Sequence, residues 1–309
     1  MRAVKIPKSS RNSGTRDLAG ARSIPIGLKL ADGRIIKFPA VMGVLNVTPD
    51  SFSDGGRYLD PERAVEHALA MEAAGADLID VGGESTRPVG AREVSVEVEL
   101  ERVAGVLARL GKRLRIPISI DTHRAGVARV ALDSGAAIIN DITALGHDPE
   151  MAPLAADTKC AVVLMHMRGG PANHIKFARY RDVVSEVSSY LAERARFAQA
   201  AGIARSRIVL DPGLGFAKTA EHNLKLVAAL PALCALGYPV LMGASRKTFV
   251  ARIAGAGERE LEFGTAAVNA VAIVNGASMV RVHDVSAAAA VVRMAAAMAG
   301  RDRRFRRDA

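Results

Sequence analysis

Polar or ionisable side chains stand at, or just after, the ends of short apolar segments along most of this chain. They are Asn46, Asp121, Asn140, His166, Asp211, Lys247, Arg281 and His283. An Asp or Asn in such a position is often only the cap of a following helix. Asp211, which precedes a Pro-Gly pair, would also suit a plain turn, and His166 would suit a buried core histidine. Helix caps need no Lys, Arg or His, however, so the set as a whole predicts a functional site.

Some of these residues carry the hydrogen-bonding groups that the edge of a flat heterocycle requires. Asn140 both donates and accepts, whereas the ionised carboxylates of Asp121 and Asp211 accept from an amino group and an adjacent ring N–H. Lys247 adds a donor for a ring carbonyl or a ring nitrogen. We therefore expect these side chains to bind a planar, amide-bearing ring.

A second group of residues is suited to phosphate. Arg281 and His283 are two residues apart, so on a strand their side chains would project to the same side. An Arg fork beside a His is a good receptor for phosphate oxygens. Asn46, with the backbone of the Gly-rich residues 54–56, would complete a pocket for an anion or for Mg²⁺ bound to phosphate. The sequence thus predicts a phosphorylated group above the flat ring.

Covalent and metal-cluster chemistry are not indicated. Ser245 has no His or Asp partner that spacing reveals, so no nucleophilic triad is expected. The seven histidines are scattered without an HExxH pattern, and no GxGxxG follows the first apolar segment. Positioning of an electrophile and stabilisation of a leaving group are therefore favoured over covalent catalysis.

The elements that must position these residues alternate regularly along the chain. Near-continuous apolar segments occupy residues 41–46, 77–82, 116–121, 136–141, 161–166, 207–212, 238–243 and 278–283. They are typical of buried parallel strands, and the amphipathic stretches between them are typical of helices. Length alone would also permit a flavodoxin- or Rossmann-like sheet, but this repeated alternation favours an α/β fold, the (β/α)8 TIM barrel. In such a barrel the strand ends meet at one face, where the active site lies.

Local signals predict where several helices begin and end. Asp60, which precedes a proline, and Ser95 are expected to cap the starts of two helices. Glycines in a left-handed conformation are expected to end others, at Gly75, Gly111, Gly135 and Gly202.

A single domain is expected over residues 23–299, with an N-terminal β-hairpin at 23–38 and the barrel proper at 41–299. Period-two alternation around an Asp-Gly pair indicates the hairpin, which should lie under the amino-terminal end of the barrel. Residues 1–22 and 300–309 are basic and aperiodic, and we expect them to form disordered tails.

Composition limits the partners and the location of the protein. The net charge is +10 and the tails are strongly basic, but no interleaved aromatics or motif support nucleic-acid binding. The two cysteines lack CxxC spacing, which argues against a disulfide framework and fits a reducing cytosol. No apolar run is long enough to span a bilayer, so no membrane partner is expected and the expected location is the cytoplasm.

The motifs and their order resemble the dihydropteroate synthases, a family of folate-pathway enzymes. The similar segments are VMGVLNVTPDSFSDGG, DLIDVGGESTRP, ISIDTHR, IINDI, VVLMHMRG, LDPGLGF, GASRK and RVHDV, within roughly residues 41–298. The resemblance implies a pterin-binding TIM barrel that condenses (7,8-dihydropterin-6-yl)methyl diphosphate with p-aminobenzoate. The products would be 7,8-dihydropteroate and pyrophosphate.

The resemblance also implies a role for each matching residue. The pterin would contact Asp121, Asn140, Ile142, Met165, Asp211, Phe216, Lys247 and Arg281. The diphosphate would contact Asn46, Thr86, Arg281 and His283, and the Mg²⁺ would contact Asn46. p-Aminobenzoate would contact Phe52, Thr86, Arg87, Pro88, Phe216 and Ser245. The catalytic residues would be Asn46, Asp121, Lys247, Arg281 and His283. They would stabilise the loss of pyrophosphate and the carbocation that the arylamine attacks.

Two positions depart from the family pattern. Ala217 stands where a glycine is usual, which should affect only backbone freedom. Val89 lengthens the RPVGAREV segment by one residue, so the affinity for p-aminobenzoate and the response to sulfonamides stay open.

Two other functions also stay open. A corrinoid methyltransferase would share the pterin site, but it would have no use for the phosphate site at Asn46, Arg281 and His283. A relative that keeps the fold without synthase activity is disfavoured by the intact Lys247, Asp211 and Arg281. The resemblance further implies a homodimer formed through barrel helices.

Overall fold

Within the part of the chain that the structure describes, eight parallel strands form the centre of the molecule. The computed structural model describes residues 26–48, 60–84, 94–170 and 174–302. The strands are β3 (Ala40–Asn46), β4 (Leu78–Gly82), β5 (Ile118–Asp121), β6 (Ala136–Asp141), β7 (Ala161–Met165), β8 (Ile208–Asp211), β9 (Leu241–Met242) and β10 (Met279–Val282). They pair in the order β8-β7-β6-β5-β4-β3-β10-β9, and a parallel bridge between Leu210 and Val240 joins the two ends. The bridge closes the sheet, so the predicted (β/α)8 TIM barrel is confirmed.

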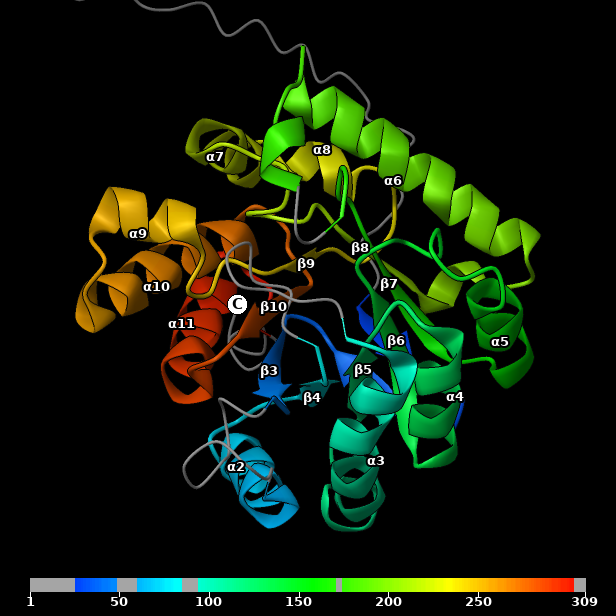
Figure 1. Cartoon of the computed structure of the whole chain (residues 1–309). Helices are drawn as coiled ribbons and strands as arrows, with labels where there is room; N and C mark the ends of the chain where they lie inside the picture. Colours follow the sequence, from blue (N-terminus) through cyan, green and yellow to red (C-terminus); the bar gives the residue numbers. More distant parts are fainter. Residues whose placement is uncertain (1–25, 49–59, 85–93, 171–173, 303–309) are drawn as a thin grey trace, which may run out of the picture.

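Helices follow the strands and surround the barrel (Figure 1). They are α2 (Pro61–Ala73), α3 (Val96–Arg113), α4 (Ala125–Asp133), α5 (Met151–Thr158), α6 (Val183–Ala200), α7 (Ala220–Ala228), α8 (Leu230–Cys234), α9 (Thr248–Ala254), α10 (Glu258–Val274) and α11 (Val285–Met298), with 3₁₀ turns η1 (His174–Phe177) and η2 (Arg205–Arg207). Their inward faces are apolar, as for the fully buried Val103, Leu107 and Leu110 of α3. These faces pack on outward-facing strand residues such as Ile79 and Ile120 and form the main hydrophobic core.

Capping residues start two helices where the sequence predicted. The Asp60 carboxylate accepts a hydrogen bond from the backbone N–H of Glu62 at 2.9 Å. Ser95 Oγ accepts one from the backbone N–H of Val98 at 3.4 Å. Each bond satisfies an N–H group that has no partner inside its helix, so α2 and α3 begin directly after these residues.

Three of the glycines expected at helix ends are left-handed. The φ angles are +103° at Gly75, +99° at Gly135 and +100° at Gly202. The prediction for Gly111 is wrong, because α3 continues past this residue. A Cβ atom at Gly111 would lie 2.3 Å from the carbonyl oxygen of Ser134. Glycine is needed there for the close approach of α3 to the end of α4, and not for a turn.

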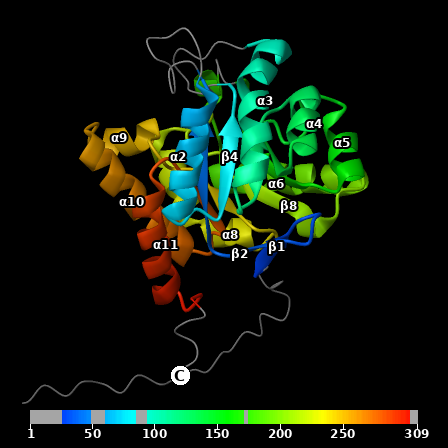
Figure 2. The same ribbon diagram turned by 90° about the horizontal axis from the view of Figure 1, so that it is seen from below.

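An antiparallel hairpin covers the amino-terminal end of the barrel (Figure 2). It consists of β1 (Gly27–Lys29) and β2 (Ile35–Lys37), which pair in register. Leu28, Leu30 and Ile36 pack against the side chains that fill the barrel near the strand starts. The hairpin therefore closes this end of the barrel with apolar side chains, as the period-two pattern predicted.

Inward-facing side chains of the strands form two layers of different chemistry. The layer near the strand starts is apolar and contains Met42, Leu78, Ile138, Val163, Val209, Leu241 and Met279. Residues two positions farther along a strand face the same way. Two positions after Leu78, Ile138, Val163, Val209 and Met279 stand Asp80, Asn140, Met165, Asp211 and Arg281, respectively. The second layer, at the carboxyl ends of the strands, therefore contains the polar residues.

Three further expectations concern membrane helices, disulfides and the ends of the chain. No helix among the described residues is long and apolar enough to cross a membrane. Cys160 and Cys234 are buried free thiols. Arg301, in the range expected to be a tail, donates to the carbonyl oxygens of Ile273 at 2.9 Å and Ala277 at 2.7 Å. Residue 301 is therefore attached to the barrel, whereas residues 1–25 and 303–309 lie outside the described residues.

Candidate active site

An arginine on β10 joins the side chains of the polar layer. Arg281 Nε lies 2.6 Å from Asp80 Oδ2, and its Nη2 lies 2.7 Å from Asp121 Oδ2. Asn140 Nδ2 donates to the same Asp80 oxygen at 2.9 Å. Strands β4, β5, β6 and β10 thus each contribute a side chain to one network inside the barrel.

Burial and pairing control the charges in this network. Burial raises the pKa of Asp121 to about 7, although the charge of Arg281 opposes the shift. Burial alone would lower the pKa of Arg281, but Asp80 and Asp121 more than offset this effect and hold it above its ordinary value. Arg281 therefore stays charged, while Asp121 can change its protonation near neutral pH when a ligand binds.

Asp211 ends β8 and stabilises the turn that follows it. Its Oδ1 accepts a hydrogen bond from the backbone N–H of Gly213 at 2.6 Å, so the turn indicated by the Asp-Pro-Gly sequence is present. Gly213 has a φ of +67°, and a Cβ atom there would lie 2.1 Å from the carbonyl oxygen of His166. Only glycine fits this contact. The turn uses one carboxylate oxygen, which leaves the other available to a ligand.

Apolar side chains provide a wall at the same end of the barrel. Ile142, Met165 and Phe216 form a buried cluster, and Met165 pairs in register with Asp211. Lys247 Nζ lies 4.1 Å from the centre of the Phe216 ring. Burial lowers the pKa of Lys247 to about 8, with a further contribution from Arg281. Together these residues offer a flat ring an apolar face and a nearby donor.

A buried lysine, Lys218, stabilises the loop that carries Phe216. Its Nζ donates to the carbonyl oxygens of Gly213 at 3.0 Å and of Phe216 at 2.9 Å. The same atom lies 3.0 Å from Nδ1 of His166. Burial lowers the pKa of His166 to about 3, and the charge of Lys218 adds to the shift. His166 is therefore neutral and buried against Lys218, which agrees with the core-histidine interpretation.

Ser245 and His283 lie together, which corrects the expectation that Ser245 has no histidine partner. Ser245 Oγ is 3.0 Å from His283 Nδ1 and accepts a hydrogen bond from the backbone N–H of His283 at 3.2 Å. Spacing could not reveal this pair, because its members follow the neighbouring parallel strands β9 and β10 and are far apart in the sequence. The contact fixes the position of the imidazole ring at the end of β10.

The structure describes only some of the other predicted residues. Asn46 ends β3 opposite Gly82, and Gly82 is in turn opposite Asp121. Asn46 therefore lies at the same strand edge as the Arg281 network. Other predicted contacts lie outside the described residues: Phe52, residues 54–56, Thr86, Arg87, Pro88 and the additional Val89.

The sequence of this chain is similar to those of known pterin-binding enzymes. The sequence signature of a family described as "Pterin binding enzyme" matches residues 42–283. The dihydropteroate synthase of Mycobacterium leprae (strain TN) is 51% identical over 254 residues, which are 80% of this chain and 89% of that protein. The chain belongs to the dihydropteroate synthase family. As a dihydropteroate synthase it is a transferase, and the corrinoid methyltransferase alternative is set aside.

Solved structures of other dihydropteroate synthases share the fold. The Xanthomonas albilineans enzyme with 4-aminobenzoic acid is 44% identical, has a TM-score of 0.81, and is matched over 88% of this chain and 98% of that one. The enzyme of the same organism in complex with 7,8-dihydropteroate is 41% identical, with a TM-score of 0.78 and the same coverage of both chains, 88% and 98%. The predicted family and TIM barrel are therefore confirmed.

Two side chains of this synthase site, Asp80 and Lys218, were not among the residues predicted from the sequence. Asp80 is fully buried and interrupts the apolar run DLIDVG. A charge in the middle of a buried strand requires a partner, and that was the signal available. Lys218 directly follows the Gly-rich segment GLGFA. Its hydrogen bonds to the carbonyl oxygens of Gly213 and Phe216 form only in the folded loop, so the sequence alone did not reveal them.

Proposed function

We propose that this synthase condenses (7,8-dihydropterin-6-yl)methyl diphosphate with p-aminobenzoate and releases 7,8-dihydropteroate and pyrophosphate. The observation that supports it best is the buried network in which Arg281 contacts both Asp80 and Asp121 at the carboxyl end of the barrel. Such a network combines acceptors for a heterocycle with a fixed cation. The relatives solved with 4-aminobenzoic acid and with 7,8-dihydropteroate give the same substrate and product for the family.

The pterin would bind between the polar layer and the apolar wall. Asp121 and Asp211 would accept from the amino group and ring N–H groups, and Asn140 would add a donor and an acceptor. Lys247 would donate to the ring, with Arg281 behind it. Ile142, Met165 and Phe216, which form one cluster, would cover its face. The lowered pKa of Lys247, about 8, leaves most of this side chain charged at pH 7.

The reaction would begin with cleavage of the bond between the pterin methylene carbon and the diphosphate oxygen. The electron pair leaves with the diphosphate, which Asn46, Arg281 and His283 would stabilise together with Thr86. The carbocation left on the methylene is stabilised by the pterin ring and the nearby carboxylates. The arylamine nitrogen then forms the new C–N bond and loses a proton to solvent.

p-Aminobenzoate would contact Phe216 and Ser245 on the described side of its site. Phe216 is held by Lys218, and Ser245 by its contact with His283. The remaining proposed contacts come from Phe52, Thr86, Arg87 and Pro88. His283 is proposed to contact the diphosphate, and Ser245 is proposed to contact the arylamine. The contact between these two side chains would therefore place the two reacting groups next to each other.

Mg²⁺ is the proposed cofactor, with the Asn46 amide oxygen as a ligand. The described residues hold no group of three or more His, Cys, Asp or Glu side chains suited to a metal. Mg²⁺ does not require one, because it commonly keeps several waters and binds through one or two protein oxygens plus substrate phosphates. An amide at the end of β3 fits that donor set. When bound, the ion would offset charge on the departing diphosphate.

We expect product formation to require the metal. Chelation with EDTA should reduce the rate at least tenfold, and added Mg²⁺ should restore it. The Asn46→Ala variant should need a higher Mg²⁺ concentration for half-maximal rate. The measurement is pyrophosphate release with and without p-aminobenzoate. If the wild-type protein forms no arylamine-dependent product, it is a fold-retaining relative without synthase activity and the proposed function fails.

A homodimer is proposed on the outer face of α10 and α11, helices that pack side by side. Apolar side chains are unusually exposed there: Phe263, Val271, Val274, Met294 and Met298. An apolar face of this kind on a monomer is typical of an interface, and a second copy of the chain is the occupant we propose. Light scattering should give twice the chain mass, and Met294→Glu with Phe263→Glu should give the monomer. A wild-type monomer at micromolar concentration would contradict the proposal.

The cytoplasm is the proposed location. Both cysteines are free thiols, which agrees with a reducing compartment.

A further inference from the structure

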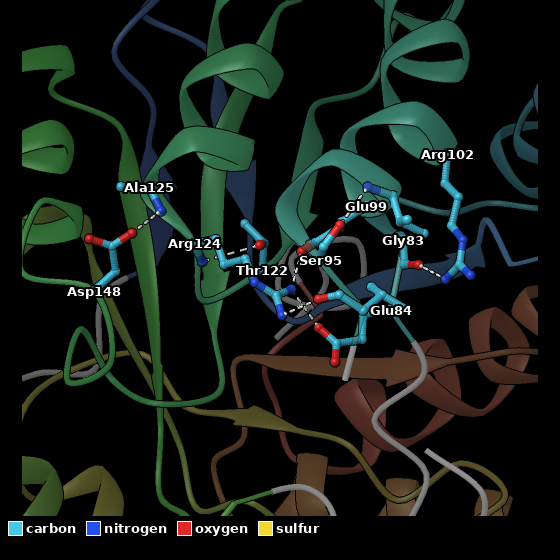
Figure 3. A network of polar contacts seen from close by, with 11 residues as sticks. Gly83, Glu84, Ser95, Glu99, Arg102, Thr122, Arg124, Ala125 and Asp148 are labelled. Atoms are coloured by element: carbon cyan, nitrogen blue, oxygen red, sulfur yellow. Dashed lines mark hydrogen bonds and ion pairs between the residues drawn. The ribbon is translucent and has the colours of Figure 1, made fainter. Parts of the chain in front are cut away.

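Lys218 is a buried cation in the loop that follows Asp211. The residue is only 9% exposed, and within the described part of the chain its Nζ forms no ion pair with a carboxylate. The buried Arg124 shows the more usual arrangement, in which the guanidinium lies 2.7 Å from Glu84 and also contacts Glu99 (Figure 3). A buried charge without an opposite charge is costly, so the folded chain must stabilise Lys218 in another way.

Hydrogen bonds inside the loop stabilise this ammonium group. Nζ donates to the carbonyl oxygens of Gly213 at 3.0 Å and Phe216 at 2.9 Å, and it lies 3.0 Å from Nδ1 and 3.4 Å from the carbonyl oxygen of His166. An ammonium group has three N–H donors, so two are used by the loop carbonyls and the third faces His166. Burial lowers the pKa of Lys218 to about 7, although the charge of Asp211 opposes the shift, so the charged form prevails below pH 7.

The same hydrogen bonds fix two of the proposed pterin contacts. Gly213 donates its backbone N–H to Asp211 Oδ1 at 2.6 Å, and its carbonyl oxygen accepts from Lys218 at 3.0 Å. Phe216, whose ring belongs to the buried apolar cluster, is held through its own carbonyl oxygen. Lys218 therefore joins the turn at Asp211 to the residue that provides the aromatic face of the wall.

The charge of Lys218 also acts on Asp211. Burial raises the pKa of Asp211, and the charges of Lys247, Lys218 and Arg281 oppose the rise. A nearby cation favours the ionised form of a carboxyl group, which is the acceptor form. Lys247 and Arg281 are proposed pterin contacts, whereas the donors of Lys218 are directed into its own loop. Lys218 can thus support the acceptor without binding the ligand.

We propose that Lys218 is a positioning residue for the pterin: its ammonium group fixes Phe216 and the turn at Asp211, and its charge stabilises the Asp211 carboxylate. The inference rests on the proposed function, in which Asp211 and Phe216 contact the pterin. It deepens that function by assigning a control of pterin affinity to a residue whose own donors are used inside the protein.

The first test is the Kd of the pterin substrate, measured by calorimetric titration at pH 7 for Lys218→Met and for a matched control, Lys225→Met. The Lys225 side chain is 59% exposed and pairs with Glu221 on the surface. For Lys218→Met we expect Kd to rise about tenfold or more, as for the loss of two buried charge-assisted hydrogen bonds. Lys225→Met should stay within about twofold of wild type.

The second test is the pH dependence of that affinity, which a purely structural role would not change. Binding needs the ionised Asp211, so affinity is lost as pH falls through the pKa of this carboxyl group. Loss of the Lys218 charge raises that pKa, and the midpoint of the affinity loss should move up by about half a pH unit or more. In the Asp211→Asn background, Lys218→Met should not move the midpoint.

Asn223→Ala is the control for loosening of the loop alone. It removes the hydrogen bond that Asn223 Oδ1 accepts from the backbone N–H of Gly215 at 2.9 Å, but it changes no charge. The midpoint should therefore stay at its wild-type value, even where the affinity itself falls.

Two further measurements keep the inference testable if Lys218→Met folds poorly or if the chain lacks synthase activity. Lys218→Gln keeps amide donors in the buried position but has no charge, so it should show the same shift of the midpoint. Hydrogen exchange of the backbone amides of Gly213 and Phe216 should be faster in both Lys218 variants than in Lys225→Met, whatever the activity.

Four results would each overturn the proposal. They are an unchanged Kd in Lys218→Met, an unchanged midpoint in both Lys218 variants, an equal midpoint shift in Asn223→Ala or in the Asp211→Asn background, and amide exchange no faster than in Lys225→Met. Failure of the proposed function would show instead as wild-type protein that binds the pterin but forms no arylamine-dependent product.

Discussion

The Arg281→Ala variant is expected to lose about 3–5 kcal/mol of unfolding free energy and most of its synthase activity, because it removes the cation from a buried group of charges. Arg281 pairs with Asp80, which is fully buried, and with Asp121, whose side chain is 11% exposed. Without the guanidinium, either the carboxylates stay charged and unpaired or they take up protons. Both outcomes cost free energy, and protonation also removes the acceptors proposed for the pterin. Urea unfolding followed by circular dichroism measures the stability, and pyrophosphate release measures the activity.

Two comparison variants isolate the cause of that loss. Lys225→Ala breaks an exposed pair between Lys225 and Glu221, whose side chains are 59% and 73% exposed, and should leave the unfolding free energy close to that of wild type. The double variant Asp80→Asn, Arg281→Met removes one charge of each sign and should recover much of the stability but not the activity. A loss for Arg281→Ala as small as that for Lys225→Ala would show that the buried network does not hold the barrel together.

The position of the candidate site could be predicted because all the strands of the barrel run in the same direction. Asp121 and Asp211 end their strands and Asn140 is the last residue but one of β6, and parallel strands in a closed barrel bring their carboxyl ends to one edge. Period two then decides which side chains face inward. Met165 and Asp211 obey this rule, and they lie opposite each other in adjacent strands. No contact had to be known in advance for this part of the prediction.

The partners of these residues could not be predicted, because they depend on contacts between distant parts of the chain. Arg281 and Asp80 are separated by 201 positions, and Ser245 meets His283 only after β9 and β10 have paired. Gly111 illustrates the same limit, since a glycine near a helix end signals a left-handed turn as readily as a close helix contact. The distinction lies in the carbonyl oxygen of Ser134, which only the folded chain brings near.

The Asp211→Asn variant is expected to bind the pterin substrate about a hundredfold more weakly, while its turn stays intact. The turn needs an acceptor at Oδ1 for the N–H of Gly213, and an Asn side chain supplies one. The other oxygen becomes an amide NH₂, which places a donor against the donors of the pterin. Losing charge-assisted bonds of about 1.5–3 kcal/mol each accounts for the size of the effect. Calorimetric titration with the pterin substrate measures it.

The same variant should also change the pH dependence of binding. Burial raises the pKa of Asp211, so the acceptor form that binds the pterin is present above that pKa and is lost as pH falls through it. Wild-type affinity should therefore weaken toward acid pH, and Asp211→Asn should lose that part of the dependence.

The matched control for Asp211→Asn is Asp141→Asn, at the end of the fourth barrel strand along the chain, β6. Asp141 is buried like Asp211, but its oxygens accept from the backbone N–H groups of Thr143 at 2.7 Å and Leu145 at 2.9 Å. It therefore caps its own loop, and its replacement should lower the unfolding free energy by about 1–3 kcal/mol while changing pterin affinity less than about twofold. If both variants lost pterin affinity equally, the effect would come from general weakening of the barrel edge. If neither lost it, Asp211 would not be a pterin ligand.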